Sequence, residues 1–113
     1  MSNILLFTHD CEIRGFHIYR NIWKPNIGDI VCCKIEPENR RDKFAVAVIN
    51  NDVVVGHIPR EHSRVCYYFL IRGGHIHCTI TGKHRNTGHG LGIPAELLFI
   101  GENDILKLES LLS

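Results

Sequence analysis

A run of four charged residues, Arg40-Arg41-Asp42-Lys43, is the part of the sequence best suited to binding chemistry. The carboxylate of Asp42 is a hydrogen-bond acceptor that can hold a terminal hydroxyl group, whereas it would repel an internal phosphate. The cations on either side can contact phosphates. This combination predicts a site for the end of a nucleic acid strand. The simpler interpretation is a solvated turn, since charge runs usually face water.

Other cations and aromatic residues extend this pattern. Arg20 and Arg60 add positive charge for phosphates, and Phe16, Tyr19 and Trp23 offer ring faces on which bases stack. Tyr19 and Trp23 can equally well serve to close a β-barrel, which is the structural alternative.

A predicted β-hairpin positions the charged run. Phe44 to Ile49 and Val53 to Val55 are apolar and rich in β-branched residues, and Asn50-Asn51-Asp52 between them suits a turn with positive φ. Gly56 near the end of the second strand indicates a β-bulge or a close approach by another backbone.

The hairpin predicts which residues meet. In an antiparallel pair the start of one strand lies beside the end of the next, so residues 40–43 should converge with His57 and Arg60 at one edge of the sheet.

The remaining periodicity predicts further strands and two helices. Helical spacing covers residues 60–71 and ends at Gly73, and an amphipathic C-terminal helix is expected over 103–112. Turn chemistry at 24–29 separates two strands. The expected strands cover residues 3–8, 11–19, 30–36, 75–82 and 93–101. A polar break at His9-Asp10 separates the first two, and the second bends at Gly15. Five to six short strands with an inserted helix indicate a small, mostly β barrel.

Length and composition constrain the possible functions. The 113 residues fit one domain over 1–113, with a core over about 13–101, and we expect a monomer. Thirteen Lys and Arg against twelve Asp and Glu give no overall charge that favours nucleic acid or an anionic membrane, so any basic surface must be local. No stretch is long enough for a transmembrane helix. Five cysteines without a CxxC spacing predict reduced, mostly buried thiols in an intracellular protein.

Four stretches of the chain, in this order, resemble the HIRAN domain. They are Gly15 to Arg20, Glu36 to Asn39, Asp42 to Val48 and Val55 to Pro59. The resemblance covers most of the chain and implies an OB-like β-barrel that holds the free 3′ end of single-stranded DNA. It also implies a nuclear role in DNA repair or replication-fork processing, without catalytic activity.

The resemblance implies roles for individual residues. Asp42 would accept a hydrogen bond from the terminal 3′-hydroxyl, and Tyr19 and Arg20 would engage the terminal base and phosphate. The implied binding residues are Tyr19, Arg20, Asn39, Arg41, Asp42, Lys43, His57 and Arg60. RNA stays open as a ligand, since its terminal ribose also carries the hydroxyl.

The chain departs from the family at one position. Where the family has an aromatic residue before the aspartate, this chain has Arg41, which can stack through its guanidinium plane or pair with phosphate. Tight sandwiching of a base between rings is therefore not expected here.

The glycine-rich segment 83–92 predicts a flexible lid over the binding groove. Lys83, His84, Arg85 and His89 would meet phosphate from this lid; the alternative is an ordinary solvated loop.

Two other function classes are left open. His75 and His77 share one face of a strand, and with His84 or His89 they could bind a metal in a nuclease or hydrolase, although there is no HExxH motif and we expect no metal or cofactor. The second alternative is a protein-interaction module whose barrel groove takes a peptide. It would require an exposed apolar patch around Tyr19, Trp23 and the 83–92 loop.

Overall fold

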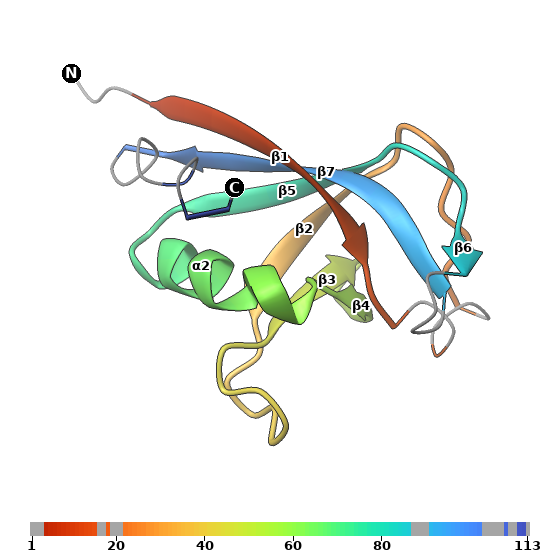
Figure 1. The fold of residues 1–113 in the computed structure, drawn as a ribbon, viewed down its shortest axis with the longest axis horizontal. Coiled ribbons are helices and arrows are strands. Elements are labelled where there is room, and N and C mark those ends of the chain that lie inside the picture. The colour runs from red at the N-terminus through yellow and green to blue at the C-terminus, as the bar shows by residue number, and fades with distance from the viewer. Residues whose placement is uncertain are drawn as a thin grey trace.

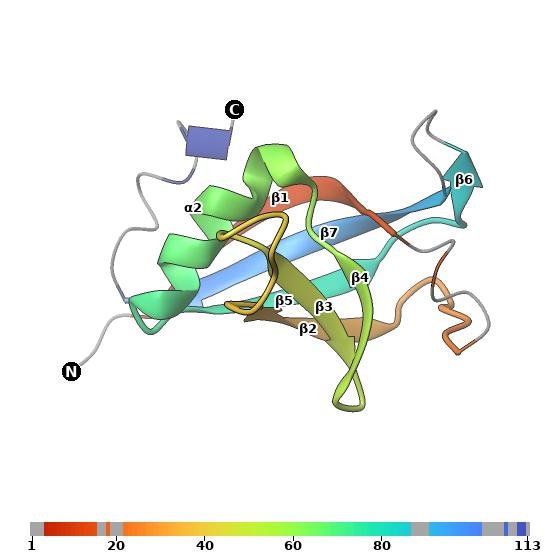
Figure 2. The ribbon, with the colours of Figure 1, turned by 90° about the horizontal axis from the view of Figure 1, so that it is seen from below.

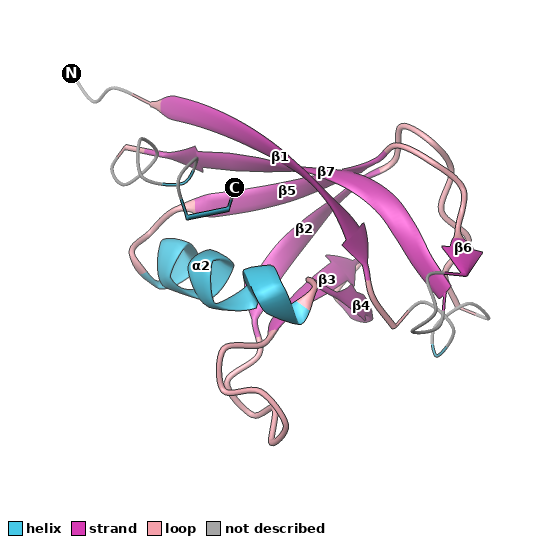
Figure 3. Cartoon of the chain, in the orientation of Figure 1, coloured by secondary structure: helices cyan, strands magenta, loops and turns pink. Residues whose placement is uncertain are grey.

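The computed structural model describes residues 4–15, 18, 22–86, 91–102, 108 and 111–112. These residues form a twisted antiparallel sheet with helix α2 packed against it (Figures 1 and 3). The strands follow the order β1-β7-β5-β2-β3-β4, and β6 pairs with β7. The bounds are β1 Leu5–Ile13, β2 Ile30–Ile35, β3 Val46–Asn50, β4 Val53–His57, α2 Arg60–Ile71, β5 His75–Ile80, β6 Arg85–Asn86 and β7 Leu91–Gly101.

The mostly β architecture predicted from the sequence is confirmed, but the sheet does not close into a complete barrel. Its two edge strands, β1 and β4, meet through the bridge between Arg14 and His57, whose two backbone hydrogen bonds measure 2.8 and 2.9 Å. Since β1 pairs with β7 along its whole length, it reaches β4 just beyond its own end.

The β3–β4 hairpin has the predicted turn. Asn51 and Asp52 have φ values of 51° and 65°, which these residue types tolerate better than most. The register shifts between Val48 and Ile49, so that Val48 pairs with Gly56. The predicted bulge is therefore confirmed.

Gly56 is also the point of close approach. A Cβ atom at this position would lie 2.5 Å from Cγ2 of Ile13 and 3.0 Å from the carbonyl oxygen of Arg14. The glycine thus allows the end of β1 to reach β4.

Helix α2 begins and ends as predicted. It follows Pro59 and covers Arg60–Ile71, and Gly73 after it has a φ of 94°. Its inner side contributes Cys66 and Phe69 to the core, where the Phe69 ring lies 5.3 Å from the Phe99 ring in an edge contact.

Helix α2 lies against one face of the sheet (Figure 2). Buried residues of α2 and of the sheet form one core, and alternate residues of β5 are buried in it. Trp23 is 4% exposed and belongs to this core. The interpretation of Trp23 as a stacking surface is therefore wrong; its ring packs inside the protein. Leu108 and Leu112 in the C-terminal segment are buried in the same cluster.

Two strand predictions near the N-terminus are corrected. His9 and Asp10 do not break a strand, because all nine residues of β1 pair with β7 and this ladder outweighs the local polarity. The strand expected over 11–19 ends at Ile13, because Gly15, with a φ of 81°, turns the chain, and Ile18 is helical.

The expected loop over 83–92 is shorter than predicted. Arg85 and Asn86 pair with Leu91 and Gly92, so the final strand begins before Ile93. Of the helix expected over 103–112, residues 108 and 111–112 are helical, and 103–107 and 109–110 lie outside the described residues. Within the described part of the chain, no helix has the length and apolar character needed to cross a membrane.

Candidate nucleic-acid interface

The loop over residues 36–44 projects from the sheet between β2 and β3 and lies beside α2 (Figures 1 and 2). Its shape depends on Asn39, whose Nδ2 donates to Oε1 of Glu36 at 2.7 Å. Oδ1 of Asn39 accepts hydrogen bonds from the backbone N–H groups of Arg41 and Asp42 at 2.9 and 3.0 Å. An asparagine turn of this kind fixes the backbone that carries the charged run.

Asp42 is attached both to its own loop and to α2. Its Oδ1 accepts from the backbone N–H of Phe44 at 2.9 Å, and its Oδ2 accepts from Oγ of Ser63 at 3.1 Å. Ser63 is buried in the first turns of α2. An ionised carboxylate has about four acceptor positions, so both oxygens can accept a further hydrogen bond from a ligand.

His57 lies on the other side of this loop. Its Nε2 is 3.1 Å from Oε1 of Glu36, the same oxygen that accepts from Asn39. The histidine side chain is 29% exposed. Glu36 therefore ties the end of β4 to the asparagine turn.

Arg60, the first residue of α2, also contacts the 36–44 loop. Its Nη2 donates to the backbone oxygen of Arg41 at 3.2 Å. A pocket of about 430 Å³ lies between these elements, lined by Arg14, Asn39, Arg41, Asp42, Ala45, Val46, His57, Ile58, Arg60 and Glu61. The predicted meeting of residues 40–43 with His57 and Arg60 at one edge of the sheet is confirmed.

A second pocket, of about 570 Å³, flanks the same loop. It is lined by Asn39, Arg40, Arg41, Asp42, Lys43, Phe44, Arg60, Ser63 and Arg64. Asp42 and Arg60 border both pockets. Six cations and two carboxylates line the two pockets together, so a local basic surface exists on a chain of formal net charge +1.

The predicted site residues thus fall into three groups. Five of them, Asn39, Arg41, Asp42, His57 and Arg60, share the first pocket, and Lys43 lines the second. Phe16, Tyr19, Arg20 and His89 lie outside the described residues.

Three of the four predicted lid residues do not line these pockets. Lys83, His84 and Arg85 are exposed, and Arg85 forms an ion pair with Glu12 of β1. β6, which contains Arg85, lies away from the 36–44 loop in both views (Figures 1 and 2). The lid remains a prediction.

Sequence reasoning missed Ser63 and Arg14. Ser63 occurs three residues after Arg60, and this spacing alone gave no sign that it would reach Asp42. Arg14 follows a strand far along the chain, and it enters the pocket because β1 and β4 meet at His57. Both contacts depend on long-range packing.

The thiols and histidines show no metal-ligand arrangement in the described part of the chain: no three His, Cys, Asp or Glu side chains form a suitable group there. Sγ of Cys33 lies 3.2 Å from Sγ of Cys78, and this hydrogen bond together with burial raises the pKa of Cys33. Burial raises the pKa of Cys66 to about 12. All five cysteines are free; Cys33, Cys66 and Cys78 are buried and Cys11 and Cys32 are half-buried, in agreement with the prediction of reduced, mostly buried thiols.

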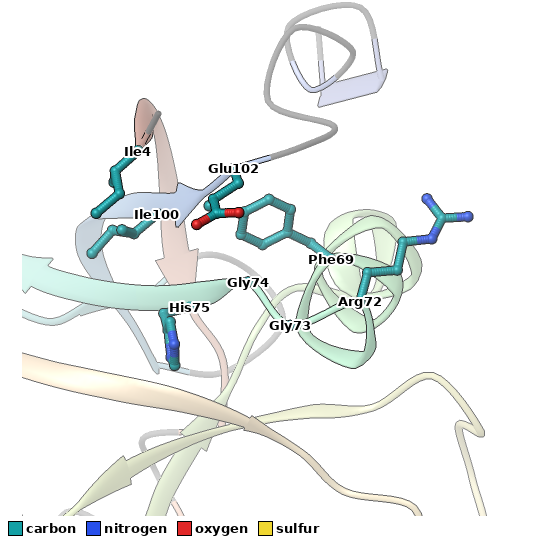
Figure 4. A pocket seen from close by; sticks show the side chains of 9 residues that line it. Ile4, Phe69, Arg72, Gly73, Gly74, His75, Ile100 and Glu102 are labelled. Carbon is teal, nitrogen blue, oxygen red and sulfur yellow. The ribbon is translucent and has the colours of Figure 1, made fainter. Parts of the chain in front are cut away.

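A further pocket, of about 490 Å³, lies at the other end of α2 and shares no residue with those around the loop. Figure 4 shows Phe69 and Glu102 close together here, with Ile4 and Ile100 to one side. The Phe69 ring packs on Gly74, where a Cβ would collide with it. This pocket lacks the clustered arginines of the loop.

Comparison with protein families identifies the fold. Residues 6–97 match the family model described as the HIRAN domain. The chain belongs to the HIRAN family. The crystal structure of the HIRAN domain of human HLTF is similar to this HIRAN domain with a TM-score of 0.74 and 22% identity, over 93% of this chain and 85% of that one.

A crystal structure of a protein from Lactobacillus plantarum also has this fold. It is similar with a TM-score of 0.60 and 14% identity, over 85% of the HIRAN domain described here and 98% of that chain. No curated protein sequence matches the chain significantly.

Proposed function

We propose that this HIRAN domain binds single-stranded DNA and holds its free 3′ end in the pocket beside Asp42. The observation that carries the proposal is the position of Asp42, a carboxylate held by Phe44 and Ser63 in a pocket that also contains Arg41 and Arg60.

A carboxylate inside a basic pocket favours strand ends for a physical reason. The arginines attract phosphates, whereas Asp42 repels any phosphate that approaches its oxygens and accepts a hydrogen bond from a hydroxyl. A terminal 3′-hydroxyl next to the last phosphodiester satisfies both requirements. Because Asn39 and Ser63 hold the acceptor in place beforehand, little ordering is needed on binding.

Family membership supports a nucleic acid as the ligand, since HIRAN domains are DNA-binding modules. The proposed role is binding without catalysis, by extension in DNA repair or replication-fork processing in the nucleus. The 3′-terminal ribose of RNA offers the same hydroxyl, so RNA is tested alongside DNA.

The test is fluorescence anisotropy with labelled oligonucleotides of one sequence that carry a 3′-hydroxyl, a 3′-phosphate or a blunt duplex end, at two salt concentrations. We expect the wild type to prefer the 3′-hydroxyl by about ten-fold or more, the value of one hydrogen bond to a charged group. Asp42→Asn keeps an acceptor for Phe44 but removes the charge, so the preference should fall to near equality.

Asp52→Asn is the matched control. It removes the same charge at the exposed turn of the β3–β4 hairpin, where asparagine tolerates the φ of 65°. This variant should keep the wild-type preference. Equal binding of 3′-hydroxyl and 3′-phosphate ends by the wild-type protein would contradict the role given to Asp42.

A protein-interaction role is the second candidate, because apolar side chains are exposed elsewhere in the molecule. Ile18, Ile22, Ile27 and Ile30 are between 63% and 67% exposed. Burial of Trp23 removes one part of the apolar patch that this alternative required. Absence of binding to every oligonucleotide at low salt would favour it.

A further inference from the structure

The outer side of α2 carries a line of residues that begins at the proposed end-binding pocket. Arg60, Arg64, Tyr68 and Arg72 follow one another at intervals of four, which places them along one side of the helix. Arg60 lines the pocket beside Asp42, and Arg72 caps the far end of α2. At about 1.5 Å per residue the line is about 18 Å long.

Aromatic rings accompany these cations. The Phe44 ring lies 5.6 Å from the Tyr68 ring, and the guanidinium carbon of Arg64 lies 5.2 Å from the first ring centre and 6.0 Å from the second. The guanidinium of Arg72 lies 5.8 Å from the Tyr68 ring, and Nζ of Lys43 lies 5.1 Å from the Phe44 ring. Half-buried rings under exposed cations form a surface on which bases can stack.

Four of the cations on and beside this surface are not paired with carboxylates of the described residues. In the part of the chain that the structure describes, Arg40, Lys43, Arg60 and Arg64 form no ion pair with a carboxylate. The second loop pocket joins Lys43 and Phe44 to Arg60 and Arg64, so the surface is continuous with the site at Asp42. Cations next to aromatic rings complement the phosphates and bases of a single strand.

We infer that the side of α2 formed by Arg64, Tyr68 and Arg72, together with Phe44, binds the nucleotides that precede the 3′ end. This inference rests on the proposed function, because the end at Asp42 sets where the strand begins. The strand then runs from Arg60 towards Arg72, with phosphates at the arginines and bases against the rings. Its length of about 18 Å matches about five stacked nucleotides at ~3.4 Å each.

The test is the dependence of affinity on strand length, measured by anisotropy with 3′-hydroxyl oligothymidylates of about two to about ten nucleotides. We expect wild-type affinity to rise by about ten-fold or more up to about five or six nucleotides and then to level off. The double variant Arg64→Gln, Arg72→Gln should flatten this rise to about two-fold, and its salt dependence should drop by ~0.7 per lost phosphate contact.

Lys34→Gln is the matched control, because it removes a cation from an exposed position on β2, on the opposite face from the buried Cys33. It should retain the wild-type length dependence. Asp42→Asn should lose the preference for the 3′-hydroxyl, which is measured separately from the length dependence.

The possible failures are distinguishable. Selective binding of 3′-hydroxyl ends with no gain in affinity beyond about two nucleotides would overturn this inference and leave the proposed function standing. The inference would also be overturned if the affinity of the double variant Arg64→Gln, Arg72→Gln rose with strand length as steeply as that of the wild type. Absence of binding to any oligonucleotide would overturn both.

Discussion

Asp42 is held by residues that are close to it in the chain and by one that is far away. The backbone of Phe44 binds one carboxylate oxygen, and Ser63 of α2 binds the other. The second contact joins the loop to the helix, so the direction of the carboxylate depends on how α2 is placed. Ser63 is therefore a positioning residue for the proposed end-binding site.

Ser63→Ala should weaken both stability and end preference. Loss of this hydrogen bond is expected to lower the free energy of unfolding by about 1 kcal/mol, because Oδ2 of Asp42 loses the hydroxyl that donates to it. The preference for a 3′-hydroxyl over a 3′-phosphate should fall as the carboxylate loses its orientation. Denaturant unfolding and the anisotropy assay measure the two effects.

Gly73→Ala provides the comparison for this variant. It adds strain at a φ of 94° without touching the loop, so it should lower stability while end preference stays at the wild-type value. If Ser63→Ala also left end preference unchanged, Ser63 would be a structural residue only.

At the scale of elements, the contact between β1 and β4 shapes the pocket. The bridge between Arg14 and His57 brings the end of β1 to the hairpin, and Gly56 next to it leaves room for Ile13. A side chain at Gly56 would push these strands apart.

Gly56→Ala should therefore destabilise the protein by roughly 1–3 kcal/mol, because the added methyl group collides with a buried side chain and a backbone oxygen. Chemical denaturation measures this. Gly73→Ala, which meets no atom within 4 Å, isolates the cost of a side chain at positive φ alone. An unchanged stability for Gly56→Ala would show that β1 can withdraw from β4 without cost.

A pair of histidines links β1 to α2. The rings of His9 and His62 meet edge to face with centroids 4.9 Å apart. Burial, and then the neighbouring His9, lower the pKa of His62 below its ordinary value of 6.5, while Glu61 opposes this shift.

Stability should accordingly fall on acidification. The pKa of His62 is about 6.5 in the unfolded state and lower in the folded state, so below pH 6.5 the unfolded state binds a proton at His62 more readily. The free energy of unfolding therefore decreases as the pH falls below 6.5, and His62 causes no such loss at higher pH. Urea unfolding at about pH 7.5 and about pH 5.5 should show this loss, and His62→Gln should reduce it. His75→Gln, at an exposed position, should leave it unchanged. An equal loss in the wild type and His62→Gln would contradict this assignment.

At the scale of the whole molecule, the fold extends past the HIRAN family match, which ends at residue 97. Leu108 and Leu112 are 2% and 6% exposed and pack in the same core as Phe99 and Phe69. We therefore propose that residues up to 112 form a single domain with the rest of the chain.

Leu108→Ala tests this proposal. Removing a fully buried leucine is expected to cost about 2–5 kcal/mol, whereas Leu111→Ala, at a side chain that is 58% exposed, should change stability by less than about 0.5 kcal/mol. Thermal and urea unfolding measure both. Equal stability of the two variants would mean that the C-terminal segment is dispensable for the core.

Most of the helix and strand bounds were predictable from local sequence patterns. The bounds of α2 followed from helical spacing between Pro59 and Gly73, and the β3–β4 hairpin followed from two apolar runs around an Asn-Asn-Asp turn, because these are local signals. The same hairpin geometry brought residues 40–43 to Arg60. The order of the motifs also identified the HIRAN family.

Other features depend on contacts between segments that are far apart in the chain, and local sequence patterns do not predict these contacts. Pairing with β7 kept β1 continuous through His9-Asp10, and packing turned Trp23 inward. The meeting of distant segments placed Ser63 on Asp42 and Arg14 in the pocket. Backbone hydrogen bonds and burial between residues far apart in the chain outweigh local preference. The charged loop was therefore predictable from the sequence, whereas the positions of Ser63 and Arg14 beside it were not.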